Sequence, residues 1–456
     1  MRLLSLDEAL STSEVKELHK TYLNSGLLQL MGLLHFDRVF ARALGCTVWD
    51  KDGHEYLDCL GGYGALNLGH NPLSVFRAIE KVSGRPNILQ ASLGELPAIL
   101  AHNLAQVTPG QLQRTFFSNS GAEAVECALK MARAATGRQT IISLEGSFHG
   151  KTFGALSATG QRKYQEPFEP MVPGFETVPF GDQGALNLLD RLSKGDVAAF
   201  IIEPILGEGG IQLHSPGYLL KVAEICRKYD ALLILDEIQT GLGRTGRLFA
   251  AEHEGIEPDI MCLAKSLGGG YIPIGATITT DSVWQRAFGG MFNCLRHTST
   301  FGGNALASAA GIAALEAIIK GQLSKHAEGI GNYMLGEFRA LAEQYDFIRK
   351  VRGQGLLIGI EFNVPKGWVG RQAYEFVGSM IAGALLNEHR IITAYTLNNP
   401  ATVRIEPPLI ITRGEAERCV EAVKQVLRKN SSNIRLALSS AGTMIRGAWD
   451  RLRGRR

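Results

Sequence analysis

Three short apolar segments in the middle of the chain constrain the fold most strongly. Residues 200–202, 232–235 and 260–264 are rich in aliphatic side chains and have the length of strands buried on both faces. Helical patterns at residues 122–136 and 218–229 separate such segments. Strands that alternate with helices predict an α/β domain built around a mostly parallel sheet.

After about residue 325 the pattern changes. A long amphipathic segment, residues 326–345, precedes a strand-like segment at residues 356–362. A second strand-like segment at residues 402–405 precedes a helical pattern at residues 415–428. These elements predict a smaller α+β domain.

Composition excludes several classes of protein. With 45% apolar and 20% charged residues the chain is typical of globular proteins, and a net charge of +3 does not indicate nucleic acid as a partner. Residues 431–456 form a basic tail with six arginines and one aspartate. We expect this tail to be a terminal helix or a disordered end, with docking to a membrane surface or a partner as the alternative.

The cysteines and the N-terminal residues bear on the compartment. Seven cysteines without a CxxC pair argue against a disulfide framework and predict a reducing compartment, the cytoplasm. Asp7, Glu8 and Glu14 stand where a signal peptide would need an apolar core. The segment closest to a membrane span, residues 302–319, contains Glu316 and predicts a closely packed helix instead.

A charged residue follows each of the three apolar segments: Glu203, Asp236 and Lys265. In open α/β sheets the carboxyl ends of the strands are where ligands bind. A single charged residue of this kind can simply mark the point where a buried strand ends at the protein surface. Three of them, with both signs of charge, favour a binding site.

Lys265 and Asp236 indicate the chemistry of that site. An amine at the end of a buried strand has a lowered pKa because desolvation disfavours its charged form, and a neutral amine can form a Schiff base with an aldehyde. A buried carboxylate such as Asp236 can hold the proton on a pyridine nitrogen, which a pyridine cofactor needs to act as an electron sink. Gln239 is placed to donate a hydrogen bond to a ring oxygen.

The segment Ser118–Ala124 predicts a phosphate site. It opens a helix in which Ser120 and Glu123 have the spacing of a capping box. Free amides at a helix start bind phosphate, although a plain capped helix would have the same sequence pattern. Nearby in the sequence, Phe148 or His149 could stack on a flat ring.

Two glycine-rich motifs point to nucleotides but do not fit. Residues 241–246 match GxGxxG, but a dinucleotide fold wants an acidic residue that ends the next strand, and Asp259 begins it. A P-loop at residues 150–152 would need glycine at the position of Glu145. We therefore do not expect a nicotinamide or P-loop nucleotide site.

Taken in order, the motifs of this chain resemble the class III aminotransferases, pyridoxal-phosphate enzymes of fold type I. The resemblance extends from about residue 35 to residue 428. The motifs are Asn119–Glu123, Phe148–Gly150, Glu203–Pro204, Gly207–Gly210, Asp236–Gln239, Lys265 and Thr298–Asn304. Residues 396–399 and 403–409 resemble the members of this family that act on putrescine.

The resemblance implies how the ring of pyridoxal 5'-phosphate is held. Lys265 would form the Schiff base and move the proton, and Asp236 would pair with the pyridinium nitrogen. Gln239 would contact the phenolic oxygen. Phe148 would stack on the ring, with His149 beside it.

The resemblance also implies a phosphate site shared by two subunits. Ser120 and the amides of Gly121 and Ala122 would hold the phosphate, and Thr300 would reach the phosphate bound by the neighbouring subunit of a homodimer. The family usually has threonine where this chain has Ala122, so we expect somewhat weaker cofactor retention.

For the substrates, the resemblance implies that Arg404 clamps the α-carboxylate of the amino acceptor. Glu208 would pair with Arg404 when the substrate has no carboxylate there, and Glu203 and Tyr63 would also line the substrate pocket. A pair of this kind lets one pocket accept both a diamine and a dicarboxylate.

The expected organisation is a large cofactor domain at residues 70–325 and a small domain formed by residues 1–69 and 326–430. We expect transamination of putrescine or cadaverine, or of the corresponding aldehyde in reverse, with 2-oxoglutarate or pyruvate. The alternatives are an ornithine or acetylornithine aminotransferase, and a mutase or decarboxylase of the same fold. No metal is expected.

Overall fold

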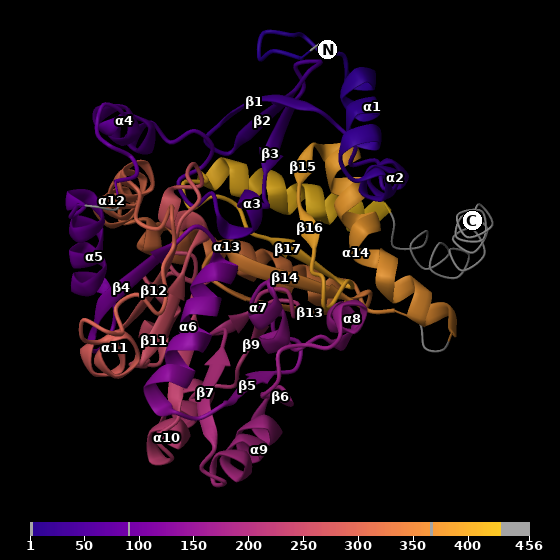
Figure 1. Ribbon diagram of the computed structural model, residues 1–456. Helices are drawn as coiled ribbons and strands as arrows, with labels where there is room; N and C mark the ends of the chain where they lie inside the picture. The colour runs from indigo at the N-terminus through magenta and orange to yellow at the C-terminus, as the bar shows by residue number, and fades with distance from the viewer. Residues whose placement is uncertain (1–2, 90–91, 365–367, 430–456) are drawn as a thin grey trace.

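The computed structural model describes residues 3–89, 92–364 and 368–429, so the basic tail lies outside the described residues (Figure 1). Its centre is a seven-stranded sheet. In spatial order the strands are β4 (Leu112–Ser118), β12 (Gly275–Thr280), β11 (Ile260–Leu263), β10 (Leu232–Asp236), β7 (Val197–Ile202), β5 (Thr140–Leu144) and β6 (Phe175–Val178).

The sheet is mostly parallel, as the sequence predicts. Strands β6, β5, β7, β10 and β11 pair in parallel. Strand β12 is the exception, because it runs antiparallel to both β11 and β4. The three apolar segments of the sequence are the last three residues of β7, the first four of β10 and the whole of β11 with Ala264. These three strands are buried along their whole length.

Helices cover both faces of this sheet, and neighbouring residues of one strand face different cores. On β10, Leu233 faces one core and Ile234 the other. One face is covered by α6 (Gly121–Thr136), α7 (Phe153–Ala158) and α11 (Asp281–Phe288). The other is covered by α5 (Glu95–Val107), α9 (Asp182–Leu192), α10 (Tyr218–Lys228) and α12 (Ala305–Lys320).

A second core joins both ends of the chain. Cys46, Leu57 and Cys59 from the N-terminal part pack with residues that follow Leu323. This region contains two four-stranded sheets. Their strands are β13 (Ile348–Gln354), β14 (Leu357–Phe362), β17 (Thr402–Ile405) and β16 (Ala394–Tyr395), and β1 (Phe40–Leu44), β2 (Thr47–Asp50), β3 (Glu55–Asp58) and β15 (Ile391–Ile392).

In Figure 1, β1–β3 lie beside β15, although they come from opposite ends of the chain. The helices of this region are α13 (Leu323–Gln344), α14 (Trp368–His389) and a helix at residues 413–429. The remaining elements are α1 (Thr12–Tyr22), α2 (Ser25–Leu33), α3 (Gly61–Gly64), α4 (Leu73–Val82), α8 (Arg162–Gln165), β8 (Ile205–Leu206), β9 (Gln212–Leu213) and the 3-10 turns η1 (Glu166–Phe168), η2 (Ala250–His253) and η3 (Lys265–Gly268).

Within the described ranges, no single helix has both the length and the apolar character to cross a membrane. Helices α12 and α13 meet these criteria only when taken together, as a pair bent by 60°.

Candidate active site

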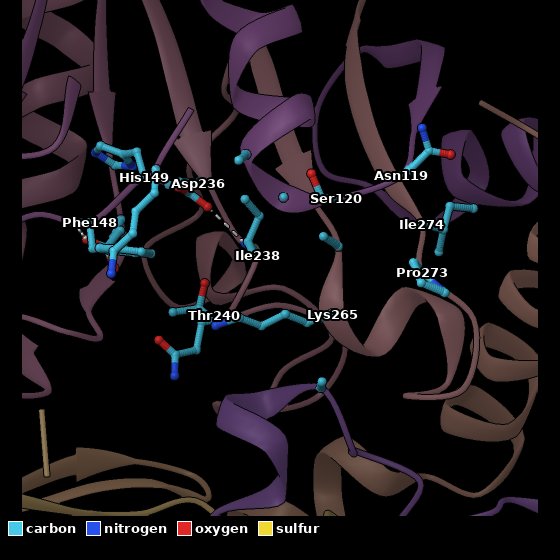
Figure 2. Close-up of a pocket in the computed structure, with 18 of the residues that line it drawn as sticks. Asn119, Ser120, Phe148, His149, Asp236, Ile238, Thr240, Lys265, Pro273 and Ile274 are labelled. Atoms are coloured by element: carbon cyan, nitrogen blue, oxygen red, sulfur yellow. Dashed lines mark hydrogen bonds and ion pairs between the residues drawn. The ribbon is translucent and has the colours of Figure 1, made fainter. Parts of the chain in front are cut away.

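A cavity of about 570 Å³ opens at the carboxyl ends of the central strands (Figure 2). Most of the residues singled out in the sequence line it. They are Ser120, Gly121, Ala122, Phe148, His149, Glu203, Glu208, Asp236, Gln239 and Lys265.

Lys265 lies directly after β11, at the start of η3. Its φ of +48° is in the left-handed region, which costs a side-chain-bearing residue about 1–3 kcal/mol. Burial lowers the pKa of the Lys265 amine, and the carboxylates of Glu406 and Glu208 oppose that shift. In Figure 2 the side chain runs across the cavity toward Thr240. The strand end therefore presents a reactive amine to the cavity.

Asp236 ends β10 and is 4% exposed. Its Oδ2 lies 2.7 Å from Nδ1 of His149, and its Oδ1 accepts a hydrogen bond of 3.1 Å from the Ile238 amide. Nε2 of His149 is buried and has no hydrogen-bond partner among the described residues. The imidazole and the amide thus fix the orientation of the Asp236 carboxylate.

The start of α6 forms the third part of the cavity. Ser120 has an extended backbone and caps the helix, with its Oγ accepting a hydrogen bond of 3.2 Å from the Glu123 amide. The predicted reciprocal capping box forms only in part, because the Glu123 carboxylate accepts a hydrogen bond of 2.7 Å from the Asn119 amide. The first-turn amides of Gly121 and Ala122 have no carbonyl partner within the helix and face the cavity, which suits an anion.

Glu203 joins two loops of the cavity wall. Its oxygens accept hydrogen bonds from the amides of Phe148, at 2.9 Å, and Gly207, at 3.0 Å. Burial raises the pKa of Glu203 to about 7, although both amides favour the charged form. This loop-joining arrangement was not part of the sequence prediction, in which Glu203 contacts substrate.

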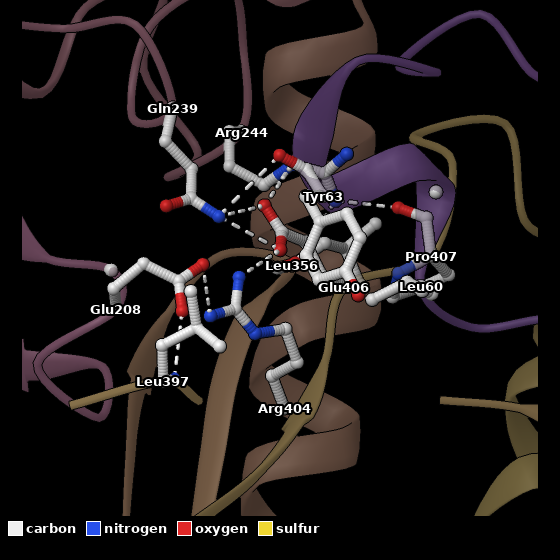
Figure 3. Close-up of polar contacts among 12 residues, drawn as sticks. Leu60, Tyr63, Glu208, Gln239, Arg244, Leu356, Leu397, Arg404, Glu406 and Pro407 are labelled. Carbon is white, nitrogen blue, oxygen red and sulfur yellow. Dashed lines mark hydrogen bonds and ion pairs between the residues drawn. The ribbon is translucent and has the colours of Figure 1, made fainter. Parts of the chain in front are cut away.

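Arg404 lies on β17 and is fully buried (Figure 3). Its Nη2 is 2.6 Å from Oε1 of Glu208, which is the pairing that the sequence predicts. The second carboxylate oxygen of Glu208 accepts a hydrogen bond of 2.8 Å from the Leu397 amide. The ring of Tyr63 lies beside the pair, with its centroid 5.2 Å from Cζ of Arg404.

Two buried residues beside this pair were missed in the sequence. Glu406 and Arg244 are both fully buried, and Glu406 lies between Gln239, Arg244 and Arg404 in Figure 3. Nε2 of Gln239 is 2.9 Å from each carboxylate oxygen of Glu406. The signal was present, because Glu406 is a carboxylate next to the apolar strand that carries Arg404.

Thr300 does not line this cavity. It lies in a separate cleft of about 390 Å³, together with Leu89, Leu93 and Ser299. The assignment of Thr300 to the phosphate bound by a neighbouring subunit stays a prediction.

The donor set of the cavity fits pyridoxal phosphate. Lys265 offers an amine for an aldehyde, Asp236 offers a buried carboxylate for a ring nitrogen, and the start of α6 offers amides for a phosphate. The three groups come from three different elements and line one cavity, as a flat ring with these substituents requires.

Comparisons with known proteins agree with this geometry. Residues 32–427 match the family model of the aminotransferases of class III. The chain is similar to the ornithine aminotransferase of Toxoplasma gondii ME49, with 31% identity over 93% of this chain and 96% of that one and a TM-score of 0.83. A second structure of that enzyme is described as having partial occupancy of PLP at its active site.

Two further solved structures are similar over nearly their whole length. The acetylornithine aminotransferase of Elizabethkingia anophelis has 30% identity, covers 92% of this chain and 100% of its own, and has a TM-score of 0.77. An (S)-enantioselective omega-transaminase of Thermomicrobium roseum has 29% identity, covers 92% of this chain and 99% of its own, and has a TM-score of 0.83.

Proposed function

Because this chain belongs to the class III aminotransferases, which are PLP-dependent enzymes of fold type I, we propose that its amino donor is a terminal amine. The favoured donors are diamines such as putrescine or cadaverine, with the corresponding aldehydes as substrates in the reverse direction. The amino acceptor is a keto acid such as 2-oxoglutarate or pyruvate.

The paired Glu208 and Arg404 carry this proposal. Arg404 is paired with Glu208, which lines the cavity and whose other oxygen accepts a hydrogen bond from the Leu397 amide. A terminal amine has no carboxylate on its reacting carbon, so the pair stays closed while such a donor reacts. A keto acid has a carboxylate on its reacting carbon. That carboxylate can take the place of Glu208 and accept two parallel hydrogen bonds from the Arg404 guanidinium.

The other residues position and protonate the reactants. Pyridoxal phosphate supplies the electron sink for the bond-breaking step. In our proposal Lys265 attaches the cofactor and moves the proton, and Asp236 holds the proton on the ring nitrogen. Phe148 would cover the ring, with His149 beside it and Gln239 at the phenolic oxygen, since all three line the cavity.

The phosphate completes this assignment. We assign it to Ser120 with the amides of Gly121 and Ala122, because the start of a helix favours anions. For the substrate side we assign Glu203, which lines the same cavity, and Tyr63, which lies beside Arg404. Tyr63 contacts the Arg404 pair, and Glu203 fixes the loop that carries Glu208.

An ω-amino acid such as ornithine or acetylornithine is the second candidate donor, because two of the similar structures are aminotransferases for these compounds. The deciding experiment uses the loaded enzyme with each donor and no keto acid, and follows the visible absorption band. We expect putrescine or cadaverine to bleach the band at least about tenfold faster than ornithine at equal concentration, a difference of about 1.4 kcal/mol.

The acceptor is then added as the control for transamination. Recovery of the band with 2-oxoglutarate or pyruvate shows that the second half of the reaction occurs. Faster bleaching by ornithine or acetylornithine than by either diamine would replace the diamine proposal with the second candidate.

We also propose a homodimer in which each site takes Thr300 from the partner. Leu89 and Leu93 are exposed in the cleft that holds Thr300, and exposed apolar side chains of this kind mark subunit interfaces. Thr300→Ala should weaken cofactor retention about tenfold or more, because a hydrogen bond to a charged phosphate is lost.

Mixed subunits test this arrangement. A dimer of one Lys265→Ala subunit and one Thr300→Ala subunit contains one site in which both residues are native. Its cofactor affinity should therefore return to that of the unchanged enzyme. If Thr300 served its own subunit, neither site of the mixed dimer would be native, and affinity would stay low.

We propose a cytoplasmic location, which the cysteines support. The seven cysteines are scattered without a CxxC pair, and Cys59 and Cys419 lie as neighbouring thiols in the second core. Free neighbouring thiols are typical of a reducing compartment.

A further inference from the structure

Glu406 is a buried carboxylate without a hydrogen-bonded ion pair. Its closest arginine contacts are Nη1 of Arg404, at 3.6 Å, and Nε of Arg244, at 4.0 Å. A buried carboxylate costs several kcal/mol unless hydrogen bonds and opposite charge compensate it. The distances show that much of the compensation comes from the Gln239 amide, at 2.9 Å from both oxygens.

Arg244 is held mainly by other groups. Its Nη1 donates hydrogen bonds to the carbonyl oxygens of Leu356, at 3.0 Å, and Pro407, and its Nη2 donates to Oδ1 of Asn67 at 2.6 Å. Glu406 is therefore not explained as the fixed partner of Arg244. The carboxylate instead faces Gln239, which lines the cavity, and Arg404.

The loop before α4 is shaped around this carboxylate. Gly64 has a φ of +83°, and a Cβ at that position would lie 2.6 Å from Oε1 of Glu406. A side chain at this position would therefore collide with the carboxylate as well as strain the backbone. Glycine at this position thus leaves the space that the carboxylate occupies.

An ionised carboxylate accepts hydrogen bonds and donates none, so Glu406 fixes which end of the Gln239 amide faces it. Nε2 must face Glu406, and Oε1 then faces Gly207, where an added Cβ would lie 1.9 Å from that oxygen. The side chain of Gln239 is thus held in one orientation at the cavity wall.

Glu406 also affects Lys265 through its charge. Burial lowers the pKa of the Lys265 amine, and among the charges that shift it the carboxylates of Glu406, Glu208 and Asp236 raise it and the guanidinium of Arg404 lowers it. Glu208 lies on the cavity wall and pairs with Arg404, whereas Glu406 is enclosed and fixed. Its charge therefore stays near Lys265 whichever group occupies Arg404.

We propose that Glu406 is a positioning residue of the active site, whose fixed carboxylate orients Gln239 and supplies a permanent negative charge beside Lys265 and Arg404. This inference rests on the roles proposed above for Lys265 and Gln239. It does not depend on which amine is the donor.

The test is a pH titration of the visible absorption band of the cofactor-loaded enzyme. Glu406→Gln keeps the size and an acceptor for Gln239 but removes the negative charge. Loss of that charge disfavours the protonated nitrogen at Lys265, so the titration midpoint should fall by about one pH unit. Glu406→Asp keeps the charge, and its midpoint should stay within about 0.3 pH units of the unchanged enzyme.

A second measurement guards against loss of folding. Glu406→Gln leaves Arg244 its hydrogen bonds to the carbonyl oxygens of Leu356 and Pro407 and to Asn67, so a thermal melting curve compared with that of the unchanged enzyme shows whether the variant folds. A folded variant with an unchanged midpoint would overturn the proposal.

Keto-acid affinity gives an independent readout beside Arg404. Glu208→Gln removes the competing carboxylate, so that a keto acid meets Arg404 directly. Adding Glu406→Gln to this variant should tighten 2-oxoglutarate binding about three- to tenfold, because Arg404 loses its remaining negative neighbour. Equal or weaker binding would contradict the proposed charge. If diamines fail to bleach the band but the titration midpoint of Glu406→Gln is shifted, the diamine proposal is rejected. The proposed role of Glu406 is then still supported.

Discussion

Lys265→Ala should abolish transamination while leaving the fold intact. The expected loss of turnover is at least about 10⁴-fold, because the variant loses covalent attachment of the cofactor and a proton transfer that alone contributes about 10²–10⁴-fold. Stability should change by less than about 1 kcal/mol, since alanine removes a buried amine with a lowered pKa and creates no buried charge.

Borohydride reduction followed by mass measurement checks this prediction. The unchanged enzyme should retain the cofactor as added mass on the peptide that contains Lys265, and Lys265→Ala should retain none. Lys151→Ala is the matched control, because Lys151 lies at the same cavity and is exposed to solvent. Undiminished turnover by Lys265→Ala, or labelling that depends on Lys151, would remove the basis of the proposed chemistry.

Asp236→Asn should lower turnover by about 10²–10⁴-fold, with the enzyme folded and the cofactor still attached. Asparagine keeps the size of the side chain and its contact with His149 but carries no negative charge for a protonated ring nitrogen. The loss should fall on kcat rather than on KM for the amine, because the charge acts on the bond-breaking step.

Glu237→Gln is the matched control for that variant. Glu237 is the next residue and is also buried, but it faces away from the cavity and accepts hydrogen bonds from the Thr240 hydroxyl and the amides of Ala250 and Ala251. Its replacement should lower thermal stability and leave the turnover of folded enzyme near its original value. If Asp236→Asn behaved like Glu237→Gln, Asp236 would be a structural residue.

The sequence predicts the central strands well, for a physical reason. Strands β7, β10 and β11 are buried on both faces, so each appears as a continuous apolar segment that stops at a charged residue. The positions of Asp236 and Lys265 at the cavity follow directly from that pattern.

Other features depend on contacts between distant parts of the chain. Strand β12 ends in threonines, so its sequence lacks the continuous apolar pattern of a parallel strand. Its antiparallel direction depends on pairing with β4. Glu406 was missed in the sequence because its contact with Gln239 forms only when the chain after β17 meets the chain after β10. The contact of the Glu123 carboxylate with Asn119 is a local alternative to the capping box that spacing alone does not distinguish.

The parallel pairing of β3 with β15 has a consequence for synthesis on the ribosome. The seven strands of the large sheet lie between Leu112 and Thr280, so they can leave the ribosome and pair before β15 and β17 have been made. The nascent chain then acquires the Lys265 half of the site first and the Arg404 half last. A chain released early would hold Lys265 without Arg404, and on the roles proposed above it would lack the group that binds the keto acid.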